Sequence, residues 1–466
     1  MKQLITALLL VGLVHSLAVA QKYERPKVLT PSTYRGDVVP QPDPHSLADA
    51  KWFEVFQDEK LRTLIDEAVR YNYDVHEAMA HVDEARANLG ITRSEQFPTI
   101  GASADITTQR LSRDGSFTIP APVKRDRTFG SVLLNLFSFE LDIWGRLRKQ
   151  TAAARAELAA TEEARKAVLT TVVSDVATTY FNLRELDFEL GIAKRTLESR
   201  RESLRIIQLR QERGVSNLLD LRQAEELVYG ATEVIPALEQ AIEQQENFLS
   251  YLVGKNPQSI VRGLELTGQR MPPSVPAGIP SDLIERRPDI RSAEQQLIAA
   301  NARIGVAKAA FFPRISLTGF LGFESSQLTS LFTNPRSVWG LMPQLAQPIF
   351  TGGRLKSNVR FTQAQKEEFL VNYQRTIENA FREVSDSLVA NRKVKEVRTE
   401  REKLVETLQD RVRLAYLRYN GGVANLLEAL DADRELFNAE RSLAQARRDE
   451  LLSVVQLYKA LGGGWQ

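Results

Sequence analysis

Apolar and polar residues follow three successive patterns in each half of the chain. Residues 58–96 and 281–311 are rich in alanine and charged side chains, and they predict helices that each end before a Phe-Pro pair. Alternating apolar and small polar residues follow, and they predict β-hairpins at about 99–142 and 314–350. A helical period then returns in both halves. The pattern predicts a mainly α-helical fold with four strands per chain.

The first strand of each hairpin has one clearly apolar face. These faces carry Ile100, Ala102, Ala104 and Ile106 in the first half, and Ile315, Leu317, Gly319, Leu321 and Phe323 in the second. The second strands, at about 128–142 and 337–350, are apolar on both sides in places, so the alternation leaves their register open. Long polar loops, 111–127 and 325–336, join the strands.

A heptad pattern marks the longest helical segment, 152–213, which contains no proline. Apolar residues recur there every seven positions, at Leu169, Val176, Leu183, Leu190, Leu197 and Leu204. A helix of this length would span about 93 Å, so the heptads predict coiled-coil-like packing against other helices. Glycines near 214 and 422 predict turns into return helices at 217–252 and 425–460, which gives two long helical hairpins.

The two halves also resemble each other in sequence. Residues 204–219 match residues 412–427 at an offset of 208, and the same offset carries Gly145-Arg146-Leu147 onto Gly353-Arg354-Leu355. We therefore expect an internal two-fold repeat. The expected parts are a first repeat at 58–254, a proline-rich linker at 255–280 and a second repeat at 281–466.

Residues 1–20 have the features of a secretory signal peptide. Lys2 supplies a charged start, residues 4–13 are apolar, and Ala18-Val19-Ala20 gives a cleavage site of small residues. The mature chain would begin near Gln21, and 21–57 would form an N-terminal arm. Because no other segment is as apolar as a transmembrane helix, the expected classes are periplasmic, secreted and outer-membrane β-barrel proteins.

Composition argues against an enzyme. The 466 residues contain no cysteine and four histidines, which excludes disulfides and thiolate sites and leaves little for metal binding or acid–base chemistry. His76 and His81 lie five residues apart, about 140° around a helix, where they cannot share a metal ion. Lys and Arg number 61 against 59 Asp and Glu, so net charge does not favour nucleic acid. We expect no catalysis, cofactor, metal or nucleic-acid partner.

Four strands are too few to close a membrane barrel, which needs about eight. Either the strands form an ordinary soluble sheet, or several chains pool them, and three chains would supply twelve. The aromatic residues near the strand ends fit a membrane interface and a buried sheet equally well. The strands alone leave both alternatives open.

Several motifs together resemble the outer-membrane factors of tripartite efflux pumps, the TolC-like family, and most closely its OprM-like branch. They are Tyr23-Glu-Arg-Pro26, Phe139-Glu-Leu-Asp142-Ile-Trp144-Gly145-Arg146, Arg286-Arg-Pro288-Asp289-Ile290-Arg291, Ala309-Ala-Phe-Phe-Pro313-Arg-Ile315, Pro348-Ile-Phe350-Thr-Gly-Gly-Arg354 and Leu457-Tyr-Lys-Ala-Leu-Gly-Gly-Gly464. The resemblance covers essentially the whole chain. Lipoprotein members of this branch begin their mature chain with cysteine, which is absent here, so ordinary signal cleavage is expected in place of acylation.

The resemblance implies a homotrimeric tube with a twelve-stranded barrel in the outer membrane and a long periplasmic barrel of coiled-coil helices. The arm at 21–57 would be periplasmic. The implied partners are a periplasmic adaptor (membrane fusion) protein, an inner-membrane proton-driven transporter of the RND type, and outer-membrane lipid. The implied function is a passive exit duct for toxic compounds, which confers multidrug resistance and is gated at its periplasmic end.

The resemblance also points to two candidate sites on the second helical hairpin and on both turns. The gate would be Leu427 and Asp431, four residues apart on one helix face, with Glu428 as a weaker member. Three copies would make an apolar ring and an acidic ring that favours cations. The turns that would dock the adaptor are Arg213, Gly214, Val215, Ser216 and Asn217, and Gly422, Val423, Ala424 and Asn425.

Two other functions remain compatible with the residues. One is an exit duct for secreted polypeptide, and the other is an exported trimeric coiled-coil structural protein with a soluble β head. Extraction by detergent alone would favour a duct, whereas a water-soluble protein would favour the structural alternative.

Overall fold

The computed structural model contains two compact units. It describes residues 23–36, 46–112, 120, 122, 124–269, 276–333 and 336–465, so the expected signal peptide, 1–20, lies outside the described residues. Unit 1 contains Asp83–Ala160, Glu294–Asn372 and the N-terminal residues up to Pro26. Unit 2 contains Lys27–Val82, Thr161–Ala293 and Tyr373–Gln466. The long helices α5 and α9 each contribute residues to both units.

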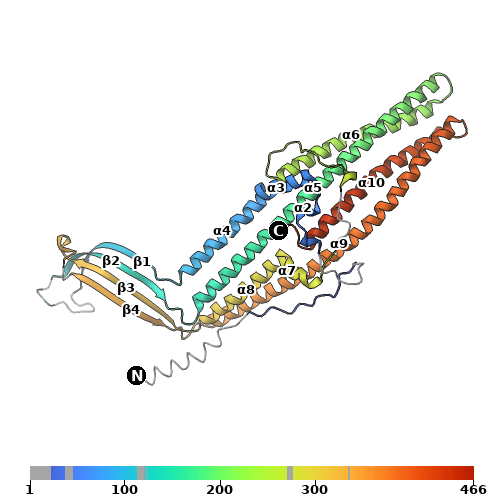
Figure 1. Cartoon of the computed structure of the whole chain (residues 1–466). Helices are drawn as coiled ribbons and strands as arrows, with labels where there is room; N and C mark the ends of the chain where they lie inside the picture. Colours follow the sequence, from blue (N-terminus) through green and yellow to red (C-terminus); the bar gives the residue numbers. More distant parts are fainter. Residues whose placement is uncertain are drawn as a thin grey trace. The chain divides into compact units, whose positions relative to one another are not determined.

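Helices account for most of the described chain (Figure 1). They are α2 Trp52–Val55, α3 Glu59–Tyr71, α4 Tyr73–Ser94, α5 Arg146–Glu212, α6 Leu218–Leu252, α7 Leu283–Arg286, α8 Pro288–Ala309, α9 Arg354–Asn420 and α10 Leu426–Ala460, with 3₁₀ turns η1 Leu47–Asp49, η2 Leu266–Gly268, η3 Pro280–Asp282 and η4 Leu328–Ser330. Equal lengths occur in both halves: 22 residues in α4 and α8, 67 in α5 and α9, and 35 in α6 and α10. Among the described residues, no helix combines the length and apolarity needed to cross a membrane.

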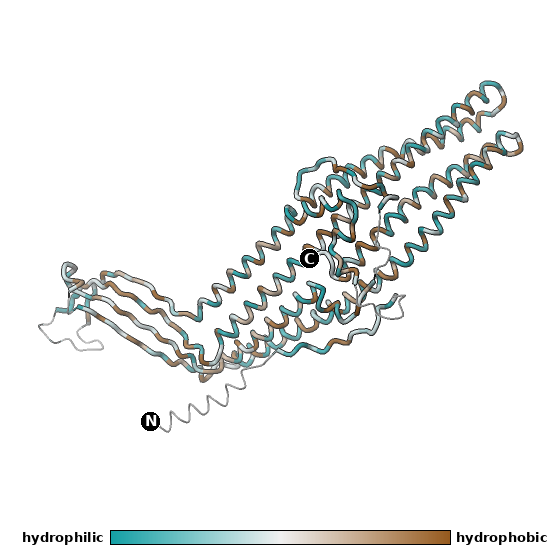
Figure 2. Tube along the Cα trace, viewed as in Figure 1, coloured by the Kyte–Doolittle hydropathy of each residue, from teal (hydrophilic) through white to brown (hydrophobic). Residues whose placement is uncertain are grey.

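Unit 1 contains one antiparallel sheet with the order β1-β2-β3-β4. Its strands are β1 Ile100–Arg110, β2 Asp126–Glu140, β3 Arg314–Ser325 and β4 Ser337–Ala346. The pairing settles the register that the sequence left open, because Ala102 lies opposite Leu134, Leu134 opposite Leu321, and Leu321 opposite Trp339. This apolar row crosses all four strands, and Trp339 in it is 74% exposed. Apolar residues recur along the strands (Figure 2).

The strand ends differ from the expected ones. β2 begins at Asp126 and ends at Glu140, and β4 ends at Ala346 and not at Phe350. Ala346 already pairs with Arg314, the first residue of β3, so the ladder has no further partner there. The outer edges of β1 and β4 have no partner strand among the strands that the structure describes.

Two expected helices are broken. The first, predicted at 58–96, is interrupted at Asn72, whose side-chain Oδ1 accepts hydrogen bonds from the N–H groups of Asp74 and Val75 at 2.9 and 3.2 Å and starts α4. Its Nδ2 donates to the carbonyl of Leu252 at 2.8 Å, which fixes the break against the end of α6. The second break is at Arg287, which is extended (ψ 119°) because Pro288 follows it.

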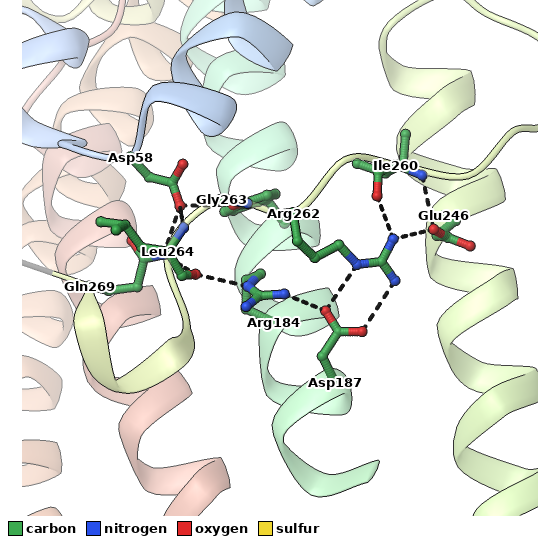
Figure 3. Close-up of polar contacts among 10 residues, drawn as sticks. Asp58, Arg184, Asp187, Glu246, Ile260, Arg262, Gly263, Leu264 and Gln269 are labelled. Carbon is green, nitrogen blue, oxygen red and sulfur yellow. Dashed lines mark hydrogen bonds and ion pairs between the residues drawn. The ribbon is translucent and has the colours of Figure 1, made fainter. Parts of the chain in front are cut away.

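The linker after α6 is attached to α5 and α6 through Arg262 (Figure 3). The Arg262 guanidinium donates to Asp187 of α5 at 3.0 and 3.1 Å and also pairs with Glu246 of α6. Asp187 accepts a further bond from Arg184 at 2.6 Å. The part of the linker around Arg262 therefore lies along α5 and α6, because charged groups on both helices hold it in one position.

A buried carboxylate, Asp58, joins the start of α3 to the same linker (Figure 3). It accepts hydrogen bonds of 2.8 Å from the Tyr180 hydroxyl, the Leu264 N–H and the Gln269 amide, and it also caps α3. Burial alone would raise the pKa of Asp58, but these hydrogen bonds stabilise the charged form and lower the pKa below its ordinary value of 3.8.

Replacing Asp58 with Ala should lower the free energy of unfolding by about 3 kcal/mol, because several buried donors would lose their acceptor at once. Chemical denaturation of the detergent-solubilised protein measures this change. Asp83→Ala is the matched control, since the exposed Asp83 pairs with Arg86 on its own helix and its loss should cost at most about 0.5 kcal/mol. Equal effects of the two substitutions would contradict the structural role given to Asp58.

Candidate functional site at the hairpin turns

The first helical hairpin turns at residues 213–217. Gly214 has φ of 73°, a backbone conformation that other residues rarely adopt, and its N–H donates to the Gln211 carbonyl at 2.9 Å. The N–H groups of Val215 and Ser216 both donate to the Arg210 carbonyl and so close the end of α5. Asn217 then starts α6 by accepting from the Asp220 N–H at 2.9 Å.

The second hairpin repeats this geometry. Gly422 also has φ of 73°, Val423 donates to the Arg418 carbonyl at 3.1 Å, and Asn425 accepts from the Glu428 N–H at 3.0 Å. A Cβ placed on Gly214 or Gly422 would meet no atom within 4 Å. Both turns are therefore open surfaces, on which Val215 and Val423 are exposed apolar residues.

The candidate gate residues lie on the exposed face of α10. Leu427 is 54% exposed and Glu428 is exposed, whereas Leu426, Ala429, Leu430 and Ala432 of the same helix turns are buried. Leu426 and Leu430 pack with Ile207 and Ala224 of the first hairpin. This packing fixes the rotation of α10, and Leu427 points away from the core of unit 2.

Both candidate gate carboxylates are paired with arginines within the chain. Asp431 accepts from Arg411 of α9 at 2.8 Å and from Arg434 of α10 at 2.7 Å. Glu428 pairs with Arg418 of α9 at 3.5 Å. The negative charge expected of an acidic ring is therefore compensated, because each Asp431 is paired with two arginines.

Sequence reasoning missed these three arginines, although a signal was present. Arg411 and Asp431 lie about equally far from the turn at Gly422, as do Arg418 and Glu428, and such positions face each other in an antiparallel hairpin. Arg434 lies three residues after Asp431 on the same helix face.

A buried ion pair connects the two hairpins close to the candidate gate residues. Arg200 of α5 donates to Asp433 of α10 at 2.6 Å, and the two side chains are only 6% and 14% exposed. Arg200 also donates to the Leu227 carbonyl of α6 at 3.0 Å and lies over the ring of Phe437. Breaking such a pair leaves an uncompensated buried charge, so it holds α10 firmly against the first hairpin.

A pair of buried carboxylates forms a second connection. Glu185 and Glu189 of α5 are 4% and 3% exposed, and Glu189 accepts from Arg441 at 3.0 Å and Gln445 at 3.1 Å of α10. Arg448 lies 3.5 Å from Glu185. Burial, together with the hydrogen bond and the charge of Glu189, raises the pKa of Glu185 from 4.5 to about 8.

Comparison with known proteins identifies this architecture. The model of the family described as outer membrane efflux protein matches residues 64–255 and 279–463. The chain belongs to the outer membrane efflux protein family. It is 40% identical over 428 residues to the solvent efflux pump outer membrane protein SrpC of Pseudomonas putida, which covers 91% of this chain and 90% of SrpC.

Solved structures agree with this membership. A membrane protein from Pseudomonas aeruginosa superimposes with a TM-score of 0.88 at 32% identity, covering 95% of this chain and 100% of the other. The open MtrE outer-membrane channel of Neisseria gonorrhoeae superimposes with a TM-score of 0.87 at 32% identity, covering 96% and 98%. The described part of this chain has the mainly helical fold of these structures, with four strands.

This outer membrane efflux protein is therefore a passive channel of the outer membrane with a large periplasmic helical portion, and not an enzyme. Outer membrane proteins of efflux pumps work with an adaptor and an inner-membrane transporter in tripartite assemblies. The connection of α5 to α10 described above belongs to the helical portion of such a channel.

The raised pKa of Glu185 makes the stability of this efflux protein depend on pH. A carboxyl group with a raised pKa stabilises the fold fully below its ordinary pKa of 4.5, and this contribution is lost as the pH rises through about 8. We expect the Tm of the detergent-solubilised protein to fall by several degrees between pH 5 and pH 9. Glu185→Gln should flatten this dependence, whereas Glu198→Gln, at an exposed position of α5, should leave it unchanged.

Proposed function

We propose that three copies of this chain assemble into one duct, with a twelve-stranded barrel in the outer membrane and a periplasmic barrel of paired coiled-coil helices. The observation that carries this proposal is the sheet of unit 1, whose outer strands β1 and β4 lack partners among the described strands. In lipid, each unmade backbone hydrogen bond costs several kcal/mol, and closure around three sheets removes all such edges. The exposed apolar row ending at Trp339 suits a lipid-facing wall.

The proposed domain organisation follows the two matching halves. A signal peptide at 1–20 and a periplasmic arm at 21–57 precede a first repeat at 58–254, a linker at 255–280 and a second repeat at 281–466. Elements of equal length in the same order support an origin by duplication. Each repeat supplies one β-hairpin to the barrel and one long helical hairpin to the periplasmic part.

The duct is proposed to close at the second hairpin. Three copies of Leu427 would form an apolar ring, and three Asp431 carboxylates would lie beside it. The pairs of Asp431 with Arg411 and Arg434 reduce repulsion between neighbouring carboxylates and tie α10 to α9. Closure is then supported by ion pairs within each chain and by the buried packing of Leu426 and Leu430.

The turns at Gly214 and Gly422 are the proposed docking points for the adaptor. Their backbone is open to solvent. Each turn has an exposed valine next to a glycine at which a Cβ would meet no other atom within 4 Å. A helical hairpin of a partner could pack closely there, because glycine leaves room for the approach of another backbone. The proposed partner on the inner membrane is a proton-driven transporter of the RND type.

The proposed cargo is small toxic organic compounds. Relatives are named for solvent, toluene and antibiotic efflux, and another, 35% identical, is the cation efflux protein CusC of Escherichia coli. As a passive conduit, the duct needs no binding chemistry for each compound, and selection would occur in the transporter.

The mass of the detergent-solubilised particle tests the proposal. Three chains per particle, together with channels in planar bilayers, are expected. A particle of one or two chains, or a protein that remains in water without detergent, would contradict the assembly and favour a structural role.

A further inference from the structure

We propose that the start of α9 binds the phosphate group of a membrane glycerophospholipid. Three arginines, Arg146, Arg314 and Arg354, line a cavity of about 590 Å³ in unit 1, and no carboxylate is among its lining residues. Arg146 is neutralised by Glu140, to which it donates two bonds of 2.9 Å. No carboxylate of the described chain pairs with Arg314 or Arg354. The cavity therefore has a net positive lining.

The first repeat shows which chemical group binds at the corresponding helix start. There, the N–H groups of Leu147 and Arg148 at the start of α5 donate to the Asp142 carboxylate at 3.0 and 2.9 Å. The paired Arg146 and Glu140 lie beside this capped helix end. Because Asp142 also pairs with the Arg148 guanidinium at 3.2 Å, two carboxylates satisfy two arginines and one helix terminus.

The second repeat lacks both carboxylates. At the offset of 208 residues, Glu140 corresponds to Pro348 and Asp142 to Phe350, while Arg146 corresponds to Arg354. The N–H groups of Leu355 and Lys356, which correspond to those donating to Asp142, have no acceptor among the described residues. A cationic cavity and a free helix start remain where the first repeat holds its own anions.

The surroundings favour a lipid phosphate over free inorganic phosphate. Ile349 and Phe350 are 97% and 90% exposed beside the cavity and offer apolar surface to acyl chains. They lie three and four residues after the end of β4 at Ala346. This step rests on the proposed membrane barrel, because headgroups then lie where its strands end and the periplasmic helices begin.

Binding of phosphatidylglycerol to the full-length, detergent-solubilised protein tests the inference, with bound lipid counted by native mass spectrometry. We expect tenfold or greater loss of affinity in Arg314→Gln/Arg354→Gln. Phe350→Asp, which restores the carboxylate of the first repeat, should cause a similar loss while the fold is retained. Arg360→Gln is the matched control, since Arg360 is exposed on the same helix away from the cavity, and it should bind normally.

Two further measurements show whether the bound phosphate belongs to a lipid or is free inorganic phosphate. Diacylglycerol with the same acyl chains should bind at least tenfold more weakly, and inorganic phosphate should not displace the lipid at millimolar concentration. Equal binding of phosphatidylglycerol by the native protein, the double variant and Phe350→Asp would overturn the inference. So would dissociation of the assembled particle by Arg314→Gln/Arg354→Gln in lipid-free detergent, because the arginines would then pair with a neighbouring chain. A normal assembled channel without lipid retention would overturn this inference alone and leave the proposed duct intact.

Discussion

Leu427→Ser combined with Asp431→Ala should open the duct, with single-channel conductance in planar bilayers rising severalfold and large antibiotics such as vancomycin entering cells. The serine would remove the proposed apolar ring of Leu427 side chains, which would exclude water and ions. The alanine leaves Arg411 and Arg434 without their shared carboxylate, so α10 loses its ion pair to α9 and like charges approach around the axis. Asp431→Ala alone should also shift ion selectivity toward anions.

Two matched substitutions control for general damage to the hairpins. Leu219 occupies the position in the first hairpin that corresponds to Leu427 and is likewise exposed, so Leu219→Ser should leave conductance unchanged. Asp410 pairs with Arg413 on its own helix, and Asp410→Ala should also behave as the native channel. If the double variant conducts like these controls, the gate lies elsewhere.

Gly422→Phe should abolish efflux while the amount of assembled protein in the outer membrane stays normal. A Cβ at Gly422 would meet no atom within 4 Å, so the added ring starts from open surface and adds bulk to the surface proposed for the adaptor. Drug susceptibility of cells that depend on this channel, with immunoblots of outer-membrane fractions, measures both quantities.

Gly422→Ala separates the two consequences of replacing this glycine. Both variants carry the strain of a φ of 73°, about 1 kcal/mol, but only phenylalanine adds bulk. Efflux should therefore be largely retained in Gly422→Ala. Loss of efflux in both variants, accompanied by loss of protein, would show that Gly422 serves only the turn.

The sequence alone predicted the kind and order of the elements closely. Heptad leucines such as Leu183 and Leu197, and glycines such as Gly214 and Gly422, predicted the long helices and their turns, because these signals are local. Strand alternation predicted four strands for the same reason. Family motifs gave the function, which the comparisons confirmed.

The boundaries predicted less well were those set by distant contacts. Asn72 interrupts a helix because its amide donates a hydrogen bond to the Leu252 carbonyl. β4 ends at Ala346 because this residue pairs with Arg314, the first residue of β3. Neither partner is adjacent in sequence, so local propensity could not place these ends.

The sequence by itself determined the helical periods, the turns and the strand pattern, since each depends on residues within a few positions of one another. The matching halves also follow from the sequence alone, because the two halves can be compared residue by residue at an offset of 208. Only the tertiary structure decided how charges pair across 20 to 252 residues: Asp431 with Arg411, Asp433 with Arg200, and Glu189 with Arg441. The chain has nearly equal numbers of basic and acidic residues, so composition does not indicate which residues pair with each other. The choice is made by packing, because buried charges are stable only where the fold brings an opposite charge within hydrogen-bonding distance.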